Sequence, residues 1–113
     1  MLYEYRRYEA MPGKLPALHA RFRDTTTRIW KKHGMRVVAF WEVQVGDAAN
    51  VLHYMLQWES MEERERKWEA FATDPEWISA RAQSEQQGTL VAHVRNELWK
   101  PTDYSEQAQK GLV

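Results

Sequence analysis

Residues 51–63 read VLHYMLQWESMEE, and this stretch decides the fold because it holds a strand, a helix start and the boundary between them. Its strand alternates apolar residues with a mixed set, which is typical of a strand with one buried face. The apolar set is Leu52, Tyr54, Leu56 and Trp58, and the mixed set is His53, Met55 and Gln57. Ser60 and Glu63 form a capping box, since the Ser60 hydroxyl can accept the backbone N–H of Glu63 while the carboxylate returns a bond. A strand therefore ends near Glu59 and a helix begins at Ser60.

The same signals mark the other elements. Apolar residues from Leu15 to Trp30 fall three, four and seven apart, which predicts a helix that Gly34 terminates. Asp74 followed by Pro75 indicates a further helix start. The predicted elements are strands over residues 2–9, 35–46, 51–59 and 89–100, and helices over residues 12–33, 60–72 and 75–88. This βαββαβ order predicts an α+β fold of ferredoxin-like topology, with a four-stranded antiparallel sheet and the helices on one face.

Composition narrows the classes of function. The 113 residues suit one domain, and 43% hydrophobic residues with six tryptophans can build a core. Sixteen basic residues balance sixteen acidic ones, so no net field attracts nucleic acid or an anionic membrane. No cysteine, phosphate-binding glycine loop or nucleophile elbow is present. Without a signal-peptide pattern or membrane-spanning run, we expect a cytoplasmic protein that binds neither nucleic acid nor membrane.

The sheet face opposite the helices decides whether the domain is a monomer. If Tyr3 and Tyr5 pack under the helices, that opposite face is too apolar for an ordinary wetted surface. It would carry Glu4, Arg6, Tyr8, Phe40, His53, Met55 and Gln57. A second copy related by a two-fold axis would cover it and form a dimeric α+β barrel around a shared, partly polar cavity. The alternative is a monomer in which this face meets water.

Several motifs then resemble the NIPSNAP family of the dimeric α+β barrel superfamily. The matching segments are Tyr3–Tyr8 with Met11–Lys14, Val38–Trp41, His53 with Trp58–Arg64, Asp74–Trp77 and Leu98–Thr102. The resemblance covers nearly all of residues 1–105, which we take as the domain, and leaves residues 106–113 as a polar tail, either disordered or lying across a partner. It implies a homodimer. The superfamily includes cofactor-independent monooxygenases, isomerases and dehydratases as well as haem-binding proteins, so activity does not follow from the fold.

His53 is the first candidate for chemistry, because imidazole exchanges a proton near neutral pH. We expect Glu4 and Arg6 beside it as catalytic partners, with Tyr8, Phe40, Met55 and Gln57 lining the cavity. The alternative is a structural ion network that fixes the dimer register. The predicted function is therefore a homodimeric barrel protein of uncharacterised function that binds a small organic molecule in its cavity. The alternatives are a cofactor-independent enzyme using His53 on an aromatic or polyketide-like substrate, or an interaction scaffold.

Metal and cofactor sites have little support in the sequence. The four histidines, at positions 19, 33, 53 and 93, lack the paired spacing of metal ligands, so we expect no metal. Haem bound through His53 or His93 has superfamily precedent, but no attachment motif is present, and we expect no cofactor. His93 and Arg95 share one face of the last predicted strand, and strand phase from sequence does not settle whether that face borders the cavity.

Overall fold

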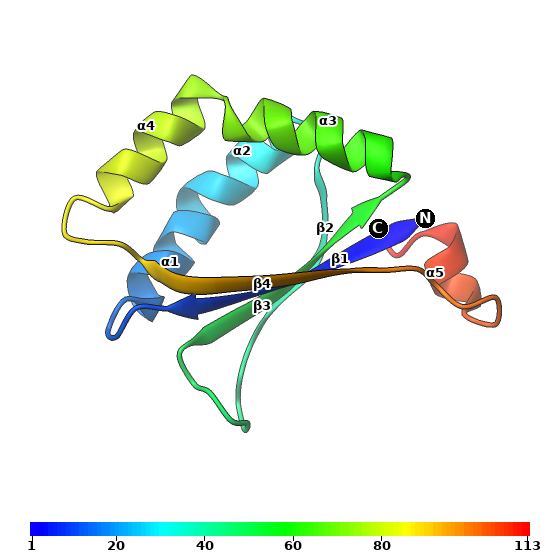
Figure 1. The fold of residues 1–113 in the computed structure, drawn as a ribbon, viewed down its shortest axis with the longest axis horizontal. Coiled ribbons are helices and arrows are strands. Elements are labelled where there is room, and N and C mark those ends of the chain that lie inside the picture. Colours follow the sequence, from blue (N-terminus) through cyan, green and yellow to red (C-terminus); the bar gives the residue numbers. More distant parts are fainter.

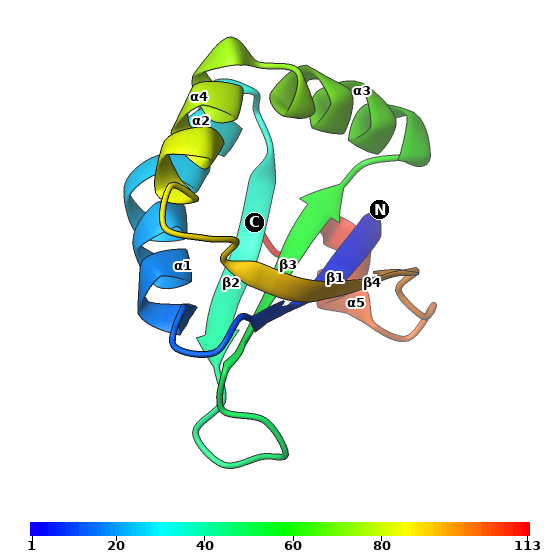
Figure 2. The same ribbon diagram turned by 60° about the vertical axis from the view of Figure 1, so that its left-hand side comes forward.

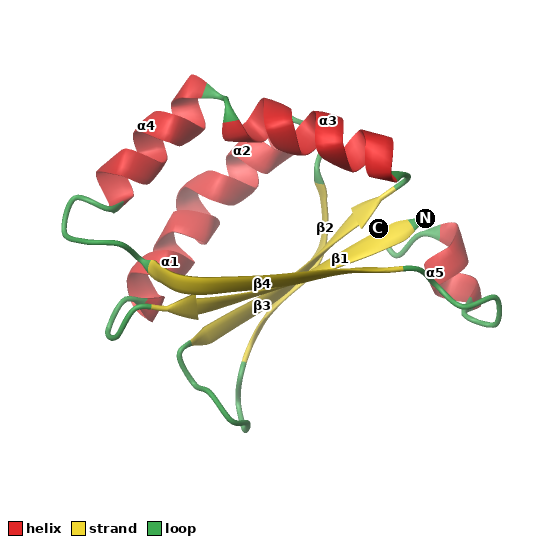
Figure 3. Cartoon of the chain, in the orientation of Figure 1, coloured by secondary structure: helices red, strands yellow, loops and turns green.

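A four-stranded antiparallel sheet in the order β2-β3-β1-β4 lies at the centre of the chain. The computed structural model describes all of residues 1–113. Figure 1 shows the elements, and Figure 3 shows the strands as one layer. Their bounds are β1 Leu2–Ala10, α1 Leu15–Arg21, η1 Phe22–Thr26, α2 Thr27–Lys32, β2 Arg36–Glu42, β3 Val51–Trp58, α3 Met61–Ala72, α4 Pro75–Ser84, β4 Val91–Trp99 and α5 Glu106–Lys110. The predicted α+β ferredoxin-like fold is confirmed.

Helices α1 to α4 cover one face of the sheet (Figures 1 and 2). The helix predicted over residues 12–33 begins later, at Leu15, and its middle turn η1 is a π-helix. Two threonine hydroxyls stabilise this wide turn by donating to carbonyls five residues back: Thr26 to Arg21 at 3.3 Å and Thr27 to Phe22 at 2.9 Å. No helix of the chain is both long enough and apolar enough to cross a membrane.

The core lies between the sheet and these helices. The apolar set of β3 faces it, as predicted, with Leu52, Tyr54, Leu56 and Trp58 all almost fully buried. The Tyr54 ring lies 5.3 to 5.4 Å from the rings of Phe22, Trp30 and Phe40. Aromatic rings from helix and sheet therefore supply most of the packing beneath α1 and α2.

The strand register corrects the predicted orientation of β1 and of Phe40. Glu4 lies opposite Leu56 and Arg6 opposite Tyr54, and directly opposed residues point to the same side of a sheet. Glu4, Arg6 and Tyr8 therefore face the helices, while Tyr3 and Tyr5 lie on the other face, which we call the open face. Phe40 also lies under the helices, because an irregularity between Val37 and Ala39 sets it opposite Tyr54. His53, Met55 and Gln57 lie on the open face, as predicted.

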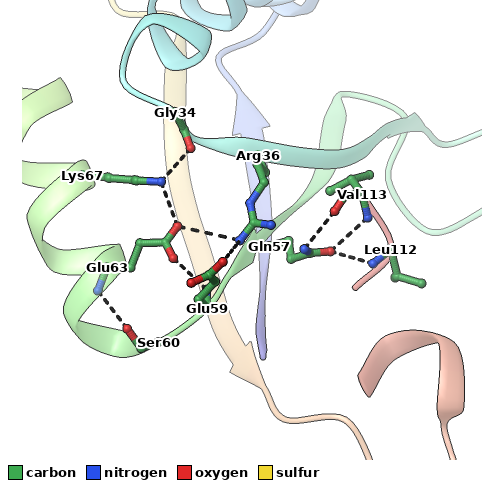
Figure 4. A network of polar contacts seen from close by, with 9 residues as sticks. All are labelled: Gly34, Arg36, Gln57, Glu59, Ser60, Glu63, Lys67, Leu112 and Val113. Carbon is green, nitrogen blue, oxygen red and sulfur yellow. Dashed lines mark hydrogen bonds and ion pairs between the residues drawn. The ribbon is translucent and has the colours of Figure 1, made fainter. Parts of the chain in front are cut away.

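The capping box connects the start of α3 to the neighbouring loop (Figure 4). Ser60 Oγ accepts the backbone N–H of Glu63 at 3.1 Å, and the Glu63 carboxylate accepts the backbone N–H of Glu59 at 3.1 Å. Lys67 donates both to Glu63 and to the carbonyl oxygen of Gly34, at 3.0 and 2.9 Å. Burial disfavours the ionised Glu63 carboxylate, but the hydrogen bond from Lys67 lowers its pKa overall. This network ties α3 to the loop that precedes β2.

The C-terminal segment folds back onto the open face of its own chain. Tyr3 donates its hydroxyl to the carbonyl oxygen of Ala108 in α5 at 2.7 Å. The Gln57 side chain accepts the backbone N–H groups of Leu112 and Val113, at 2.7 and 3.1 Å, and donates to the Val113 carbonyl oxygen at 3.1 Å (Figure 4). Residues 106–113, predicted as a polar tail, thus include a short helix and cover one end of the open face.

Candidate functional site

Glu4, predicted as a catalytic partner of His53, is the centre of a buried network on the opposite side of the sheet. Arg64 of α3 donates two hydrogen bonds to its carboxylate, from Nε at 2.8 Å and from Nη2 at 3.0 Å. Three further donors are Trp58 Nε1 at 3.1 Å, Asn96 Nδ2 at 2.9 Å and Arg6 Nη1 at 2.8 Å. Burial would raise the pKa of Glu4, but the hydrogen bonds from Arg64 and Asn96 and the charges of Arg6 and Arg64 lower it to about 2. Glu4 therefore stays ionised and has no free oxygen for a substrate.

Arg6 continues the network toward the tyrosines. Its guanidinium lies 4.4 Å from the centre of the Trp68 ring, and Nη2 donates to the Tyr8 hydroxyl at 3.4 Å. Tyr54, whose pKa is raised by burial, donates its hydroxyl to Tyr8 at 3.0 Å. Glu4, Arg6 and Tyr8 therefore form one connected group, but none of them reaches His53. The expected grouping of Glu4 and Arg6 with His53 is wrong. It assumed that Glu4 and Arg6 lie on the open face of β1, whereas they face the helices.

His53 instead pairs with a tyrosine on the open face. Its Nδ1 lies 2.8 Å from the Tyr5 hydroxyl, and the two rings stack with centres 5.8 Å apart. Tyr5 also stacks on Trp99, at 5.2 Å. Partial burial, followed by the positive charge of Arg7, lowers the pKa of His53. A neutral imidazole beside a phenol can exchange a proton with a bound molecule, so this pair keeps the chemical capacity that the sequence indicated for His53.

The other predicted residues of the open face have different surroundings. Gln57 is fully buried because the C-terminal segment covers it. Met55 lines a shallow hollow of about 240 Å³ under that segment, together with Trp99 and Leu112. Arg95 lies opposite Arg7, and His93 opposite Glu9, so both belong to the open face. Trp41 and Trp99 leave 48% and 44% of their surfaces exposed there.

On the helix side, a hollow of about 260 Å³ lies next to the Arg6–Tyr8 contact and is open to solvent beside Arg81, Thr89 and Val94; we call it the sheet–helix cavity. Four aromatic side chains line it: Tyr8, Trp68, Phe71 and Trp77. Val91 and Val94 of β4 supply an aliphatic wall, and Arg21, Arg81 and Glu85 supply the charged groups. An apolar lining with a few polar groups is typical of sites for small molecules. Of the predicted cavity residues, only Tyr8 lines this one.

Arg21 is the unusual member of this lining. The residue is 9% exposed, yet its one hydrogen bond within the chain runs from Nη1 to Ser84 Oγ at 3.2 Å. Its Nε is buried without a partner, no carboxylate lies within ion-pair distance, and the guanidinium stacks 5.4 Å from the Trp77 ring centre. Burial lowers the pKa of Arg21. The sequence signal that we missed is its position three residues after Leu18, which places a charge on the buried side of α1.

A second, larger hollow of about 400 Å³ follows the π-turn and the edge of β2. Phe40, one of the predicted cavity residues, contributes to it beside His19, Arg23 and Glu42. His19 Nε2 lies 3.1 Å from a Glu42 oxygen but is poorly aligned for a hydrogen bond. Arg23, Trp41 and Glu42 are exposed, so this hollow is a groove on the surface. No three histidine or acidic side chains in the chain come together as a metal site.

The sequence model of one family, NIPSNAP, matches residues 3–106. The chain belongs to the NIPSNAP family. Its fold is similar to that of a NIPSNAP family protein of unknown function from Agrobacterium tumefaciens, with a TM-score of 0.80, 25% identity, and 93% of this chain and 91% of that chain covered. An uncharacterised NIPSNAP domain protein from Burkholderia xenovorans gives a TM-score of 0.79 at 21% identity, with coverage of 92% and 97%. No curated protein sequence matches the chain.

The fold extends beyond NIPSNAP proteins. A candidate antibiotic biosynthesis monooxygenase from Chloroflexus aurantiacus is similar, with a TM-score of 0.56, 17% identity, and coverage of 90% of this chain and 94% of that chain. This likeness shows a shared fold and carries no chemistry. The site of this NIPSNAP protein therefore has to be argued from its own residues.

Proposed function

We propose that this NIPSNAP protein is a homodimer that binds a small organic molecule in the sheet–helix cavity of each protomer. The observation that carries the proposal is a cavity of about 260 Å³ that combines four aromatic side chains with the buried Arg21. An apolar cavity of about 150 Å³ is already large enough to bind benzene. The sequence placed the ligand between two sheets, beside Tyr8. Because Tyr8 faces the helices, the proposal moves the ligand to the helix side.

The open face supports the homodimer. Trp41 and Trp99 are each about half exposed, on a face that also carries Tyr5 and Met55. Large exposed aromatic patches mark interaction surfaces. The same face holds Arg95 and Glu97, so a copy related by a two-fold axis can set unlike charges against each other. The neutral net charge of the chain adds no long-range repulsion between copies.

Two measurements test this function. Light scattering should give twice the 13.5 kDa chain mass at micromolar concentration, and a mass of one chain would refute the homodimer. A thermal-shift and calorimetry screen of small organic molecules should yield ligands of the wild-type protein. Val94→Trp should abolish their binding, since the indole fills the cavity wall, whereas Val45→Trp on a 93% exposed loop should not. Ligands whose binding survives Val94→Trp, or a screen without ligands, would refute the site.

A second candidate function is a cofactor-independent enzyme, and the Tyr5–His53 pair favours it. The lowered pKa keeps His53 neutral and able to accept a proton near neutral pH. The Tyr5 hydroxyl, 2.8 Å from His53 Nδ1, orients the imidazole ring. His53→Ala should then abolish turnover of an aromatic or polyketide-like substrate with the dimer intact. Tyr5→Phe should reduce turnover less. Loss of the dimer in His53→Ala would instead make the residue structural.

A further inference from the structure

Arg21 and Arg64 offer the same guanidinium edge, but only one of the two is occupied. Arg64 uses Nε and Nη2 to hold both oxygens of Glu4, at 2.8 and 3.0 Å. Arg21 has a buried Nε without a partner, and its Nη2 makes no hydrogen bond within the chain, although the residue is only 9% exposed. Buried charges are normally paired, and a carboxylate fits this edge of a guanidinium. The Nε of Arg6 also lacks a partner, but Arg6 has the Glu4 carboxylate at 2.8 Å on Nη1, whereas Arg21 has no carboxylate. The empty edge of Arg21 therefore lacks an anion of the kind that Glu4 supplies to Arg64.

The lining places no carboxylate within ion-pair distance of Arg21. Glu85 is the one acidic residue there, and its two oxygens already accept from Arg81 Nε and from the backbone N–H of Leu90, at 3.2 and 3.4 Å. Because Arg21 and Arg81 are both positive, the lining keeps one net positive charge. The Arg21 guanidinium lies against the Trp77 ring, and the Glu85 charge acts on it only from beyond ion-pair distance. Its positive charge is therefore only partly compensated, which is costly at a buried position.

We infer that the ligand of the sheet–helix cavity is a small organic monocarboxylate whose carboxylate binds the Nε and Nη2 edge of Arg21. Its apolar body, aromatic or short aliphatic, lies among Trp68, Trp77 and Val94. A carboxylate matches the fork of a guanidinium with two parallel hydrogen bonds, and the indole rings favour a flat or chain-like body. This inference rests on the proposed function, since it names the ligand class of the same site.

The test compares each carboxylate with its own neutral amide. Calorimetry of the wild-type protein with phenylacetate, benzoate and hexanoate, and with phenylacetamide, benzamide and hexanamide, keeps the body fixed while removing the charge. We expect at least one carboxylate to bind 10- to 100-fold more tightly than its amide, about the contribution of hydrogen bonds to a charged group. Since it uses only the wild-type chain, this comparison does not depend on how a variant folds.

Substitutions then assign the difference to one residue. Arg21→Met keeps the length and packing of the side chain and should weaken carboxylate binding to the level of the amide. Arg23→Met, two residues along on the exposed side of the helix, should leave both affinities unchanged. Arg21→Lys keeps the charge but loses the fork, so its affinity for the carboxylate should fall between those of the wild type and Arg21→Met.

The outcomes separate this inference from the proposed function. Equal affinity for a carboxylate and its amide, or an unchanged carboxylate affinity in Arg21→Met, overturns the inference. If neutral molecules bind and Val94→Trp blocks them while no carboxylate binds, the cavity is a ligand site and the inference about its ligand is wrong. If no molecule of either kind binds, both fail together.

Discussion

Replacing Glu4 by Gln tests whether its buried charge holds the sheet to α3. The substitution keeps the shape of the side chain but turns one of its two acceptor oxygens into a donor. Glu4 receives hydrogen bonds from Arg64, Arg6, Trp58 and Asn96, so at least one arginine loses its partner. A lone buried guanidinium is costly, and we expect the variant to fold with reduced stability.

The magnitude follows from the pKa of Glu4. Its value falls from 4.5 to about 2 on folding, which corresponds to about 3 kcal/mol of unfolding free energy at neutral pH. Because the folded-state pKa is the lower one, this stabilisation is fully present above about pH 5. It is lost progressively as the pH falls toward 2, with about 1 kcal/mol left at pH 3. Glu4→Gln should therefore lower stability by about 3 kcal/mol at pH 7 and by about 1 kcal/mol at pH 3.

Urea unfolding followed by circular dichroism, at one protein concentration from pH 7 to pH 3, measures the difference between the two proteins. Glu62→Gln is the matched control, because Glu62 is 75% exposed and pairs with Arg66 on the surface of α3. It should change stability by less than about 0.5 kcal/mol at every pH. A loss in Glu4→Gln that stays constant with pH would mean that packing, and not charge, is responsible, and the reasoning above would be refuted.

Three further predictions concern the open face and the helix cap. Trp41→Arg should raise the dissociation constant of the dimer at least about 100-fold in analytical ultracentrifugation. The substitution removes about 120 Å² of indole per protomer that the dimer would bury, which is worth about 3 kcal/mol. Ile78→Arg on the outside of α4, 54% exposed, should leave that constant unchanged, and equal effects would point to another interface. Gln57→Leu removes three hydrogen bonds to residues 112–113 and should speed the exchange of their backbone amide hydrogens. Unchanged exchange would mean that α5 alone holds the segment in place. Ser60→Ala should cost about 1 kcal/mol in thermal unfolding by removing the cap of α3, and a neutral result would show that Glu63 caps the helix without it.

The sequence predicted β3 correctly and β1 incorrectly for one physical reason. In β3 all four core-facing residues are apolar, so alternation alone assigns the faces. In β1 the helix side carries Glu4 and Arg6, while Tyr3 and Tyr5 lie on the open face, which reverses the usual hydrophobic signal. Glu4 can be buried only because Arg64, sixty residues away in the chain, reaches it across the core. No local pattern contains that information, although the antiparallel register with β3 would have supplied it.

The candidate site shows the same limit. Helix signals predicted α3 and α4 and both of their N-caps, since Ser60 and Asp74 each accept a backbone N–H of the first turn. The cavity, however, is formed by residues of α1, α3, α4 and two strands, and it depends on how far these elements stand apart. The π-turn also escaped prediction, because the spacing of Leu18, Phe22 and Ile29 fits a regular helix nearly as well.

A buried charge indicates function only when the chain leaves it unsatisfied, and β1 and α1 illustrate the two cases. Glu4 is completely buried, yet every donor around it belongs to the fold, so its charge is explained by stability alone. Arg21 is nearly as buried and has a single neutral acceptor. Selection for stability favours replacing such a residue by an apolar one, since a buried ion without its counter-ion destabilises the folded state. Without ligand, Arg21→Met should therefore be at least as stable as the wild type. At saturating carboxylate it should be less stable, because only the wild type gains from binding. Lower stability of Arg21→Met under both conditions would show that Arg21 is structural.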